Sequence, residues 1–137
     1  HFGMRRAAIR DELQRYRPHS KRLEVIKLPH GITIINDAYN ANPDSMLSAM
    51  RTLAAFPAEG RKYIALGDMF ELGETSHREH RGIGRKAAEL GFEHVLFTGA
   101  DMALAAKAYL AAQAEGQDRQ VHFASKAELA ERLRAEL

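Results

Sequence analysis

The sequence predicts a Rossmann-like α/β fold, an open and mainly parallel sheet with helices on both faces. Short apolar runs, such as residues 63–66 and 94–97, alternate along the chain with longer segments of helical periodicity. The runs end at glycine or aspartate, and the segments after them begin with helix-capping residues. Strands that alternate with helices need crossover connections, which produce parallel pairing and place helices on the sheet faces.

The first forty residues predict a helix followed by two short strands. Residues 5–16 are charged and have helical periodicity, and residues 18–21 are interpreted as a connector. A β-branched run at 25–28 stops at the turn signal Pro29-His30-Gly31, and a second run follows at 32–36. We expect the two runs to form a hairpin or adjacent strands.

A helix is predicted from about residue 43 to residue 56. Asn42 can cap its free backbone N–H groups, Pro43 suits the first helical position, and Asp44 lies at the positive end of the helix dipole. One apolar face is formed by Met46, Met50 and Leu53. Residues 63–66 form the next strand, which ends at Gly67-Asp68.

The second half of the sequence repeats the strand and helix pattern. We expect a capping box at Ser76–Glu79, with an apolar stripe after it that includes His80 and closes at Gly91. A strand at 94–97 ends at Thr98-Gly99, and a helix then runs from about Asp101 to a point before Gly116. A short strand at 121–123 and a capping box at Ser125–Glu128 open the last helix.

Composition indicates one soluble globular domain. The chain has 137 residues, of which 45% are hydrophobic and 28% charged. No apolar run approaches the length of about 20 residues that a membrane helix needs, and no secretory signal opens the chain. The absence of cysteine excludes disulfides and thiolate metal sites, so we expect the cytoplasm. A net charge of +2 with interspersed signs argues against nucleic acid as a partner.

Three predicted strands end in polar or glycine residues, where open α/β folds bind ligands. These ends are Asp37, Gly67-Asp68 and Thr98-Gly99. We expect Asp37 and Asp68 to project into one crevice from neighbouring strands, where carboxylates bind ribose hydroxyls, ammonium groups or magnesium. The alternative is purely structural: each carboxylate caps a loop, and the capping rules alone explain residues 42–45.

Several motifs of nucleotide and metal sites are missing. The sequence holds no G-x-x-x-x-G-K-[ST] loop for a triphosphate, no G-x-G-x-x-G after the first strand and no G-x-S-x-G nucleophile elbow. Gly82 and Gly84 fall inside a predicted helix, where they indicate a packing feature or a weak point. His77 and His80 do not have the spacing of a zinc motif, so we predict no metal site in this chain.

Three segments resemble a known family. Residues 22–26 (Arg-Leu-Glu-Val-Ile), 37–46 (Asp-Ala-Tyr-Asn-Ala-Asn-Pro-Asp-Ser-Met) and 66–74 (Leu-Gly-Asp-Met-Phe-Glu-Leu-Gly-Glu) are similar to the C-terminal domain of Mur ligases. The second and third segments are most similar to the members that join D-alanyl-D-alanine to UDP-N-acetylmuramoyl-tripeptide. The resemblance covers residues 16–137. It implies that residues 1–17 are the tail helix of a preceding ATP-binding domain and that 18–137 are the C-terminal domain; we interpret residues 1–3 as a remnant of cloning.

The resemblance implies a ligase of peptidoglycan precursor synthesis. In this family ATP phosphorylates the carboxylate of the nucleotide-sugar peptide, and an incoming amine attacks the acyl phosphate, while magnesium offsets the phosphate charge. ATP and Mg²⁺ are held mainly by the central P-loop domain, which explains the missing P-loop here. We therefore expect this chain alone to be inactive.

The family's functional residues can be placed on matching positions. Arg22 matches the arginine that reaches the ATP phosphates, for which a fixed charge and planar fork are suited. Asp37 matches the acidic residue that contacts the adenosine ribose. Other positions follow from the two signature loops: Tyr39, Asn40 and Asn42 near the nucleotide, and Asp68, Met69 and Glu71 facing the dipeptide or the acceptor peptide.

The sequence departs from the family in two places. Lys21 stands where the family has glycine before the arginine, and lysine is less permissive of positive φ, so domain closure is expected to differ. The family also continues past the last helix into a strand and a Lys-Gly-Ser-type loop, whereas this sequence stops at Leu137. We expect the exposed sheet edge to favour self-association.

Two other functions fit the same residues. One is a stand-alone nucleotide- or phosphate-binding module of flavodoxin-like shape, and the other is a non-catalytic domain whose polar loops bind a protein. A titration with ATP and magnesium separates these from the ligase, since the ligase interpretation predicts weak binding by this chain alone.

Overall fold

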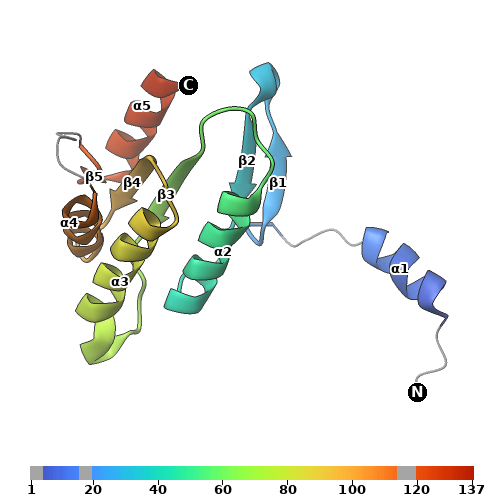
Figure 1. Ribbon diagram of the computed structural model, residues 1–137, viewed down its shortest axis with the longest axis horizontal. Helices are drawn as coiled ribbons and strands as arrows, with labels where there is room; N and C mark the ends of the chain where they lie inside the picture. Colours follow the sequence, from blue (N-terminus) through green and yellow to red (C-terminus); the bar gives the residue numbers. More distant parts are fainter. Residues whose placement is uncertain (1–4, 16–19, 114–119) are drawn as a thin grey trace. The chain divides into compact units, whose positions relative to one another are not determined.

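The computed structural model describes residues 5–15, 20–113 and 120–137, which form two compact units (Figure 1). The first unit comprises residues 1–39 and the second comprises residues 40–137. In the described part of the chain, every helix is too short or too polar to cross a membrane.

The first unit contains a helix and a β-hairpin. Helix α1 (Arg6–Arg15) matches the expected helix, except that Tyr16 lies outside the described residues. Strands β1 (Glu24–Lys27) and β2 (Thr33–Asn36) pair antiparallel, with Val25 opposite Ile35. The short 3-10 turn η1 (Pro29–Gly31) joins them, and His30 and Gly31 there have φ angles of 62° and 78°. The predicted hairpin is confirmed.

The second unit contains a three-stranded parallel sheet in the order β3-β4-β5. Its elements are α2 (Pro43–Ala55), β3 (Tyr63–Gly67), η2 (Gly73–Thr75), α3 (Ser76–Glu89), β4 (His94–Thr98), α4 (Met102–Ala112), β5 (His122–Phe123) and α5 (Lys126–Glu136). These agree with the predicted strands and helices to within two residues at the ends that are described. The predicted end of the third helix before Gly116 lies outside the described residues.

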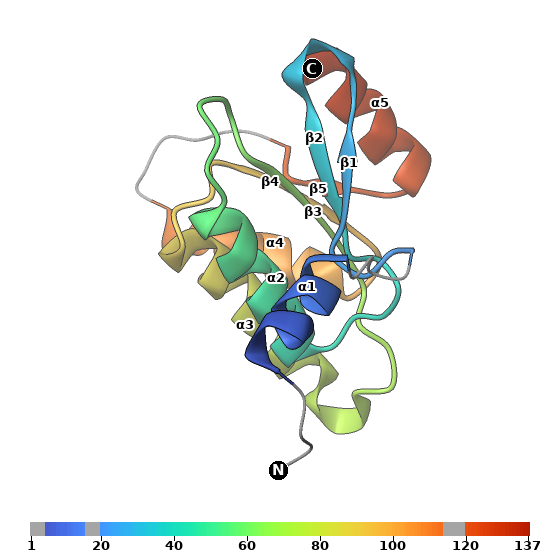
Figure 2. The same cartoon turned by 90° about the vertical axis from the view of Figure 1, so that its right-hand side faces the viewer.

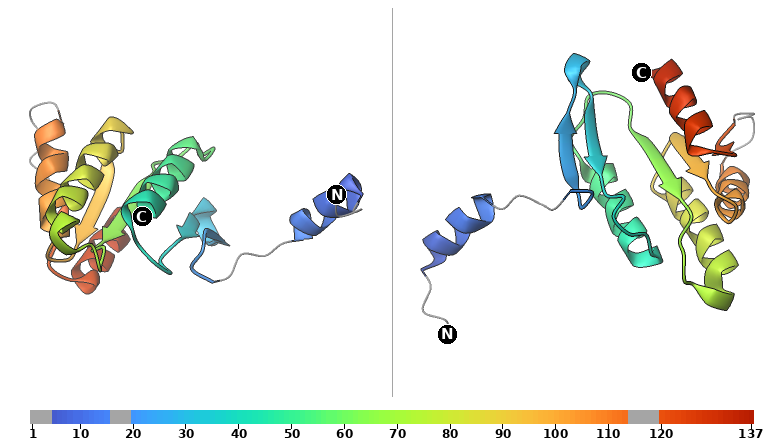
Figure 3. Two further views of the ribbon diagram at one scale, coloured as in Figure 1. Left: turned by 90° about the horizontal axis from the view of Figure 1, so that it is seen from below. Right: turned by 180° about the vertical axis from the view of Figure 1, so that it is seen from behind.

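Helices cover both faces of the parallel sheet, as Figures 2 and 3 show for α5 on one side and α3 and α4 on the other. Side chains alternate along each strand, so Leu66 and Phe97 point into the larger core with α2, α3 and α4. Leu96 and Phe123 point to the opposite face and pack against Leu129 of α5. The predicted α/β class with two covered faces is confirmed. The expectation that Asp37 and Asp68 follow neighbouring strands is wrong, because β2 belongs to the antiparallel hairpin and β3 to the parallel sheet.

Helices α3 and α4 pack closely because Gly84 has no side chain. A Cβ atom at Gly84 would lie only 2.0 Å from the backbone oxygen of Ala105. At the far end of α4, the hydroxyl of the fully buried Tyr109 donates a hydrogen bond to the carbonyl of Phe92 at 2.6 Å. Gly84 is therefore a packing feature, one of the two possibilities that the sequence offered.

Two of the three predicted helix caps are present. The Asn42 side chain accepts the Ser45 N–H at 2.9 Å, and the Ser45 hydroxyl accepts the Asn42 N–H at 3.0 Å. Ser125 accepts the Glu128 N–H at 3.2 Å. The capping box expected at Ser76 is wrong: Thr75 is the N-cap residue, and the Ser76 hydroxyl is bonded to Asp101 instead.

Strand β5 is the last strand of the parallel sheet in the described ranges, and it pairs with β4 through Phe97–His122 and Thr98–Phe123. The self-association expected at an unpaired edge is not tested by this arrangement and stays a prediction.

Candidate functional site

Arg22 and Tyr39 are brought together within the first unit. The Cζ atom of Arg22 lies 4.0 Å from the centroid of the Tyr39 ring, which is a cation–π geometry. The backbone is fixed as well, since the Tyr39 N–H donates to the Lys21 carbonyl at 2.9 Å. Tyr39 is 63% exposed. The Arg22 guanidinium therefore lies on the accessible ring of Tyr39, which is part of the predicted nucleotide loop.

Asp37 is bonded to the residue after Arg22. Its Oδ1 atom accepts the backbone N–H of Leu23 at 3.0 Å, and the residue is half-buried directly after β2. A carboxylate can accept about four hydrogen bonds, so this contact leaves acceptor capacity for a ligand hydroxyl. Asp37 is thus linked by a hydrogen bond to the residue next to Arg22, and both residues are among the predicted ATP contacts.

Lys21 adopts the backbone conformation for which glycine is favoured. Its φ angle is 64°, and that of Leu23 is 48°, so two side-chain-bearing residues in the left-handed region flank Arg22. Each such residue carries a conformational cost of about 1–2 kcal/mol. The left-handed conformation is therefore present with lysine at position 21, at an energetic cost.

Asn40 and Asn42 differ in their surroundings. The Asn42 side chain is engaged in the cap of α2, which gives it the structural role that the sequence left open. Asn40 is exposed. Contacts of either residue with a nucleotide stay predictions.

Asp68 lies at the carboxyl end of β3, where it caps a helix from a distant part of the sequence. Its Oδ1 atom accepts the backbone N–H of Met102, the first residue of α4, at 2.8 Å. Gly99 makes room for this carboxylate, because a Cβ there would lie 2.3 Å from the Asp68 carboxyl carbon. One oxygen of Asp68 thus has the capping role of the structural alternative, and a substrate contact stays a prediction.

Met69 is anchored through both its side chain and its backbone. The side chain is 2% exposed and belongs to the larger core. The backbone N–H donates to Nε2 of the fully buried His80 at 3.1 Å. Nδ1 of His80 lies 2.8 Å from the Ser76 carbonyl, so it carries the proton and donates there. Met69 and His80 thereby hold the signature loop against α3, and a contact of the Met69 side chain with substrate stays a prediction.

The loop after Met69 presents two residues to solvent. Phe70 is 78% exposed, and Glu71 is exposed with a φ angle of 62°. The sequence pattern singled out Glu71 but not Phe70. The feature that could have drawn attention to Phe70 is an aromatic residue in a polar segment directly after a strand. Glu71 has the accessibility that its predicted contact with an ammonium group requires.

A polar cluster joins the starts of α3 and α4. The Ser76 hydroxyl donates to Oδ2 of Asp101 at 2.6 Å, and this hydrogen bond holds the pKa of Asp101 below its usual value. Nε2 of His77 lies 4.0 Å from Oδ1 of the same carboxylate. Across the described ranges, no three His, Cys, Asp or Glu side chains gather where they could hold a metal ion.

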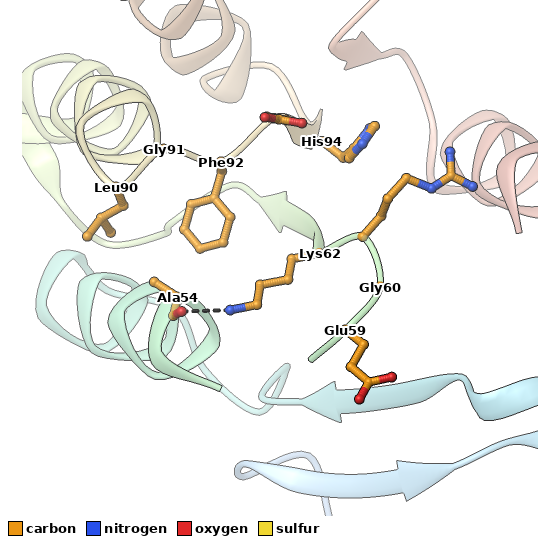
Figure 4. A pocket seen from close by; sticks show the side chains of 10 residues that line it. Ala54, Glu59, Gly60, Lys62, Leu90, Gly91, Phe92 and His94 are labelled. Atoms are coloured by element: carbon orange, nitrogen blue, oxygen red, sulfur yellow. Dashed lines mark hydrogen bonds between the residues drawn. The ribbon is translucent and has the colours of Figure 1, made fainter. Parts of the chain in front are cut away.

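A pocket of about 490 Å³ lies at the other end of the strands (Figure 4). It is bordered by residues before β3 and at the start of β4, including Lys62 and His94. The Lys62 ammonium points across it and donates to the Ala54 carbonyl at 2.7 Å. Because ligands of open α/β folds bind at the carboxyl ends of strands, we do not assign the functional site to this pocket.

The chain is similar to proteins of one kind. Residues 21–137 match the family "Mur ligase, glutamate ligase domain". The UDP-N-acetylmuramoyl-tripeptide–D-alanyl-D-alanine ligase of Escherichia coli is 34% identical over 127 residues, covering 93% of this chain and 26% of that protein. The enzyme of the same name from Mycobacterium tuberculosis is 39% identical over 89 residues, covering 62% of this chain and 18% of that protein.

Solved structures lead to the same family. The crystal structure of MurF from Acinetobacter baumannii superimposes with a TM-score of 0.81 at 29% identity, covering 98% of this chain and 27% of that chain. The chain spans roughly a quarter or less of the length of these relatives. The match over residues 21–137 includes most of the sequence and all of the predicted site residues. The chain therefore belongs to the Mur ligase family.

Proposed function

We propose that this chain is the C-terminal part of a cytoplasmic, ATP-dependent ligase that joins D-alanyl-D-alanine to UDP-N-acetylmuramoyl-tripeptide during peptidoglycan precursor synthesis. Relatives that carry this name in Escherichia coli and Mycobacterium tuberculosis support the choice of substrates. Because this chain spans about a quarter of such proteins, the activity belongs to a longer polypeptide.

The observation that carries the nucleotide part of the proposal is the Arg22–Tyr39 pair beside Asp37. Arg22 contacts the ATP phosphates, and its delocalised charge offsets theirs without any proton being gained or lost. Asp37 accepts hydrogen bonds from the ribose hydroxyls. Tyr39, Asn40 and Asn42 follow Asp37 in the sequence, and we expect them to add contacts with the nucleotide.

The proposed reaction has two steps. A carboxylate oxygen of the tripeptide attacks the γ-phosphorus of ATP, which forms an acyl phosphate and releases ADP. The free amine of the dipeptide then attacks the acyl carbon, and the amide bond forms as inorganic phosphate leaves. Arg22 contributes most where negative charge is redistributed over the phosphates, since a preorganised cation needs no reorganisation during the step.

The dipeptide part of the proposal rests on the loop at Asp68–Glu71. Glu71 is exposed at a turn with positive φ, and it faces an ammonium group of the substrate. Asp68 and Met69 hold this turn through their bonds to Met102 and His80.

Magnesium is implied by the family, but the described side chains offer no cluster of three ligands for it. We propose that the ion is held mainly by other parts of the complete protein. What the chain's own residues supply is a fixed cation at Arg22 and hydrogen-bond acceptors at Asp37.

The test is an assay of ADP release by the complete protein that carries this chain. We expect release that requires ATP, UDP-N-acetylmuramoyl-tripeptide and D-alanyl-D-alanine together. Release that is independent of the dipeptide would contradict the ligase. The isolated chain provides a second arm: weak ATP binding agrees with a site completed by other domains, whereas tight binding favours a stand-alone nucleotide-binding module.

A further inference from the structure

Glu24 is the centre of a hydrogen-bonded turn next to Arg22. Its Oε2 atom accepts the Lys21 backbone N–H at 3.0 Å, the Asn36 side-chain amide at 3.3 Å and the Ser20 hydroxyl at 3.4 Å. Asn36 stands opposite Glu24 in the hairpin register. One carboxylate oxygen therefore ties the segment before Arg22 to both strands of the hairpin.

The segment that Glu24 holds is strained. Lys21 has a φ angle of 64°, a conformation that residues with a Cβ atom rarely adopt. Such a conformation persists where the surrounding contacts over-determine it. Here the contacts are the Lys21 N–H on Glu24 and the Lys21 carbonyl, which accepts the Tyr39 N–H at 2.9 Å.

The turn fixes the backbone on both sides of Arg22 and so influences where its side chain points. The backbone N–H groups on both sides of this residue are bonded to carboxylates, that of Lys21 to Glu24 and that of Leu23 to Asp37. With its neighbours fixed, the Arg22 guanidinium lies over the Tyr39 ring at 4.0 Å. The Arg22 side chain is thus preorganised, so less conformational entropy is lost when it binds a phosphate.

We propose that Glu24 is a positioning residue for Arg22, which acts by stabilising the left-handed conformation of Lys21. The expected effect on kcat rests on the proposed function, whereas the effect on the position of Arg22 does not. Glu24 acts through the backbone of residues 21 and 22. The hydrogen bond to Glu24 offsets the steric cost that the Lys21 Cβ adds at positive φ. With glycine at position 21 this cost is absent, so Glu24 is no longer needed.

The rescue experiment compares four forms of the complete protein: wild type, Glu24→Ala, Lys21→Gly, and the double variant. We expect Glu24→Ala to lower kcat about tenfold, the typical effect of losing hydrogen bonds to a charged group, with the KM for the dipeptide unchanged. Lys21→Gly should stay close to wild type. The double variant should recover most of the loss, because glycine adopts positive φ without help. Where Arg22→Ala is impaired, a double variant no better than Glu24→Ala overturns the proposal, as does full activity of Glu24→Ala.

A second readout is independent of the reaction. Protein labelled with ¹⁵N and ¹³C at arginine should show the Arg22 side-chain resonances shifted by the Tyr39 ring current. We expect the shift to be lost in Glu24→Ala and restored in the double variant, with Tyr39→Leu as the reference for a lost ring. A shift that persists in Glu24→Ala overturns the positioning role. If Arg22→Ala is fully active while these shifts behave as expected, the proposed ATP contact fails and the positioning by Glu24 stands.

Discussion

The Nε2 atom of His80 accepts the backbone N–H of Met69 across 3.1 Å, inside a core where the His80 side chain has no solvent exposure. This bond fastens the loop at the end of β3 to helix α3. The other ring nitrogen donates to the Ser76 carbonyl at 2.8 Å, so both nitrogens of a neutral imidazole are used. His80 is therefore a structural anchor of the second signature loop.

Replacement of His80 by leucine should destabilise the fold by about 2–3 kcal/mol, because it leaves the buried Met69 N–H without an acceptor. Equilibrium unfolding in urea measures the loss. Amide hydrogen exchange at Met69 should also accelerate more than exchange in β4. His77→Leu is the matched control, since His77 is largely exposed on the same helix, and an equal loss in both variants would refute the anchoring role.

Gly84→Ala should be strongly destabilising, by about 2 kcal/mol or more, because the new Cβ would collide with the Ala105 backbone oxygen at 2.0 Å. The helix carries its own control in Gly82, where nothing lies within 4 Å of a Cβ. Gly82→Ala should raise stability by about 0.5–1 kcal/mol through helix propensity. Thermal or urea unfolding of the two variants should therefore give changes of opposite sign. Changes of the same sign would mean that α3 and α4 do not pack as described.

The Ser76–Asp101 pair predicts a dependence of stability on pH. The Ser76 hydrogen bond is the main cause that lowers the pKa of Asp101 from its usual 3.8, while desolvation of the carboxyl opposes it and the nearby His77 adds a smaller lowering. A carboxyl with a lower pKa in the folded state stabilises the fold above its unfolded pKa and loses this effect as the pH falls through the folded pKa. Ser76→Ala should raise the Asp101 pKa towards 3.8, as followed by ¹³C NMR of the carboxyl group. The stability difference from wild type should be largest near neutral pH and should narrow below pH 3.8; an unchanged Asp101 pKa would be inconsistent with this account.

Asp37 predicts a change in the use of ATP. In the complete protein, Asp37→Ala should raise the KM for ATP about tenfold, through lost hydrogen bonds to the ribose. Asp37→Asn keeps an oxygen that can accept the Leu23 N–H, so it separates the ribose contact from the backbone contact. Steady-state kinetics with varied ATP measures both variants, with Glu131→Ala on α5 as an exposed carboxylate control. An ATP KM and kcat within twofold of wild type for Asp37→Ala would exclude the ribose contact.

The sequence was sufficient for the features that depend on local pattern. The hairpin at 24–36, the alternation of strands and helices, and the Asn42 cap all follow from periodicity and capping rules. The expected cap at Ser76 failed because Asp101, twenty-five residues further along the chain, captures the hydroxyl. No local rule includes a partner at that distance.

The site could be predicted only in part. The carboxyl ends of the strands and the family resemblance selected Arg22 and Asp37, but no pattern indicated that Arg22 stacks on Tyr39. Lys21 and Leu23 on either side of Arg22 have positive φ, which a sequence does not predict for these residue types. For Asp68 the sequence left both a ligand contact and a capping role open, and its partner Met102 is identified only by the fold.

The central claim is that Arg22 contacts the phosphates of ATP, and the most direct test is the kcat of Arg22→Ala in the complete protein. Arg85→Ala is the matched control, because Arg85 is an exposed arginine on α3, outside the proposed site. The account predicts a fall in kcat of about 100-fold for Arg22→Ala and wild-type turnover for Arg85→Ala. Turnover of Arg22→Ala within twofold of wild type at saturating ATP would contradict it.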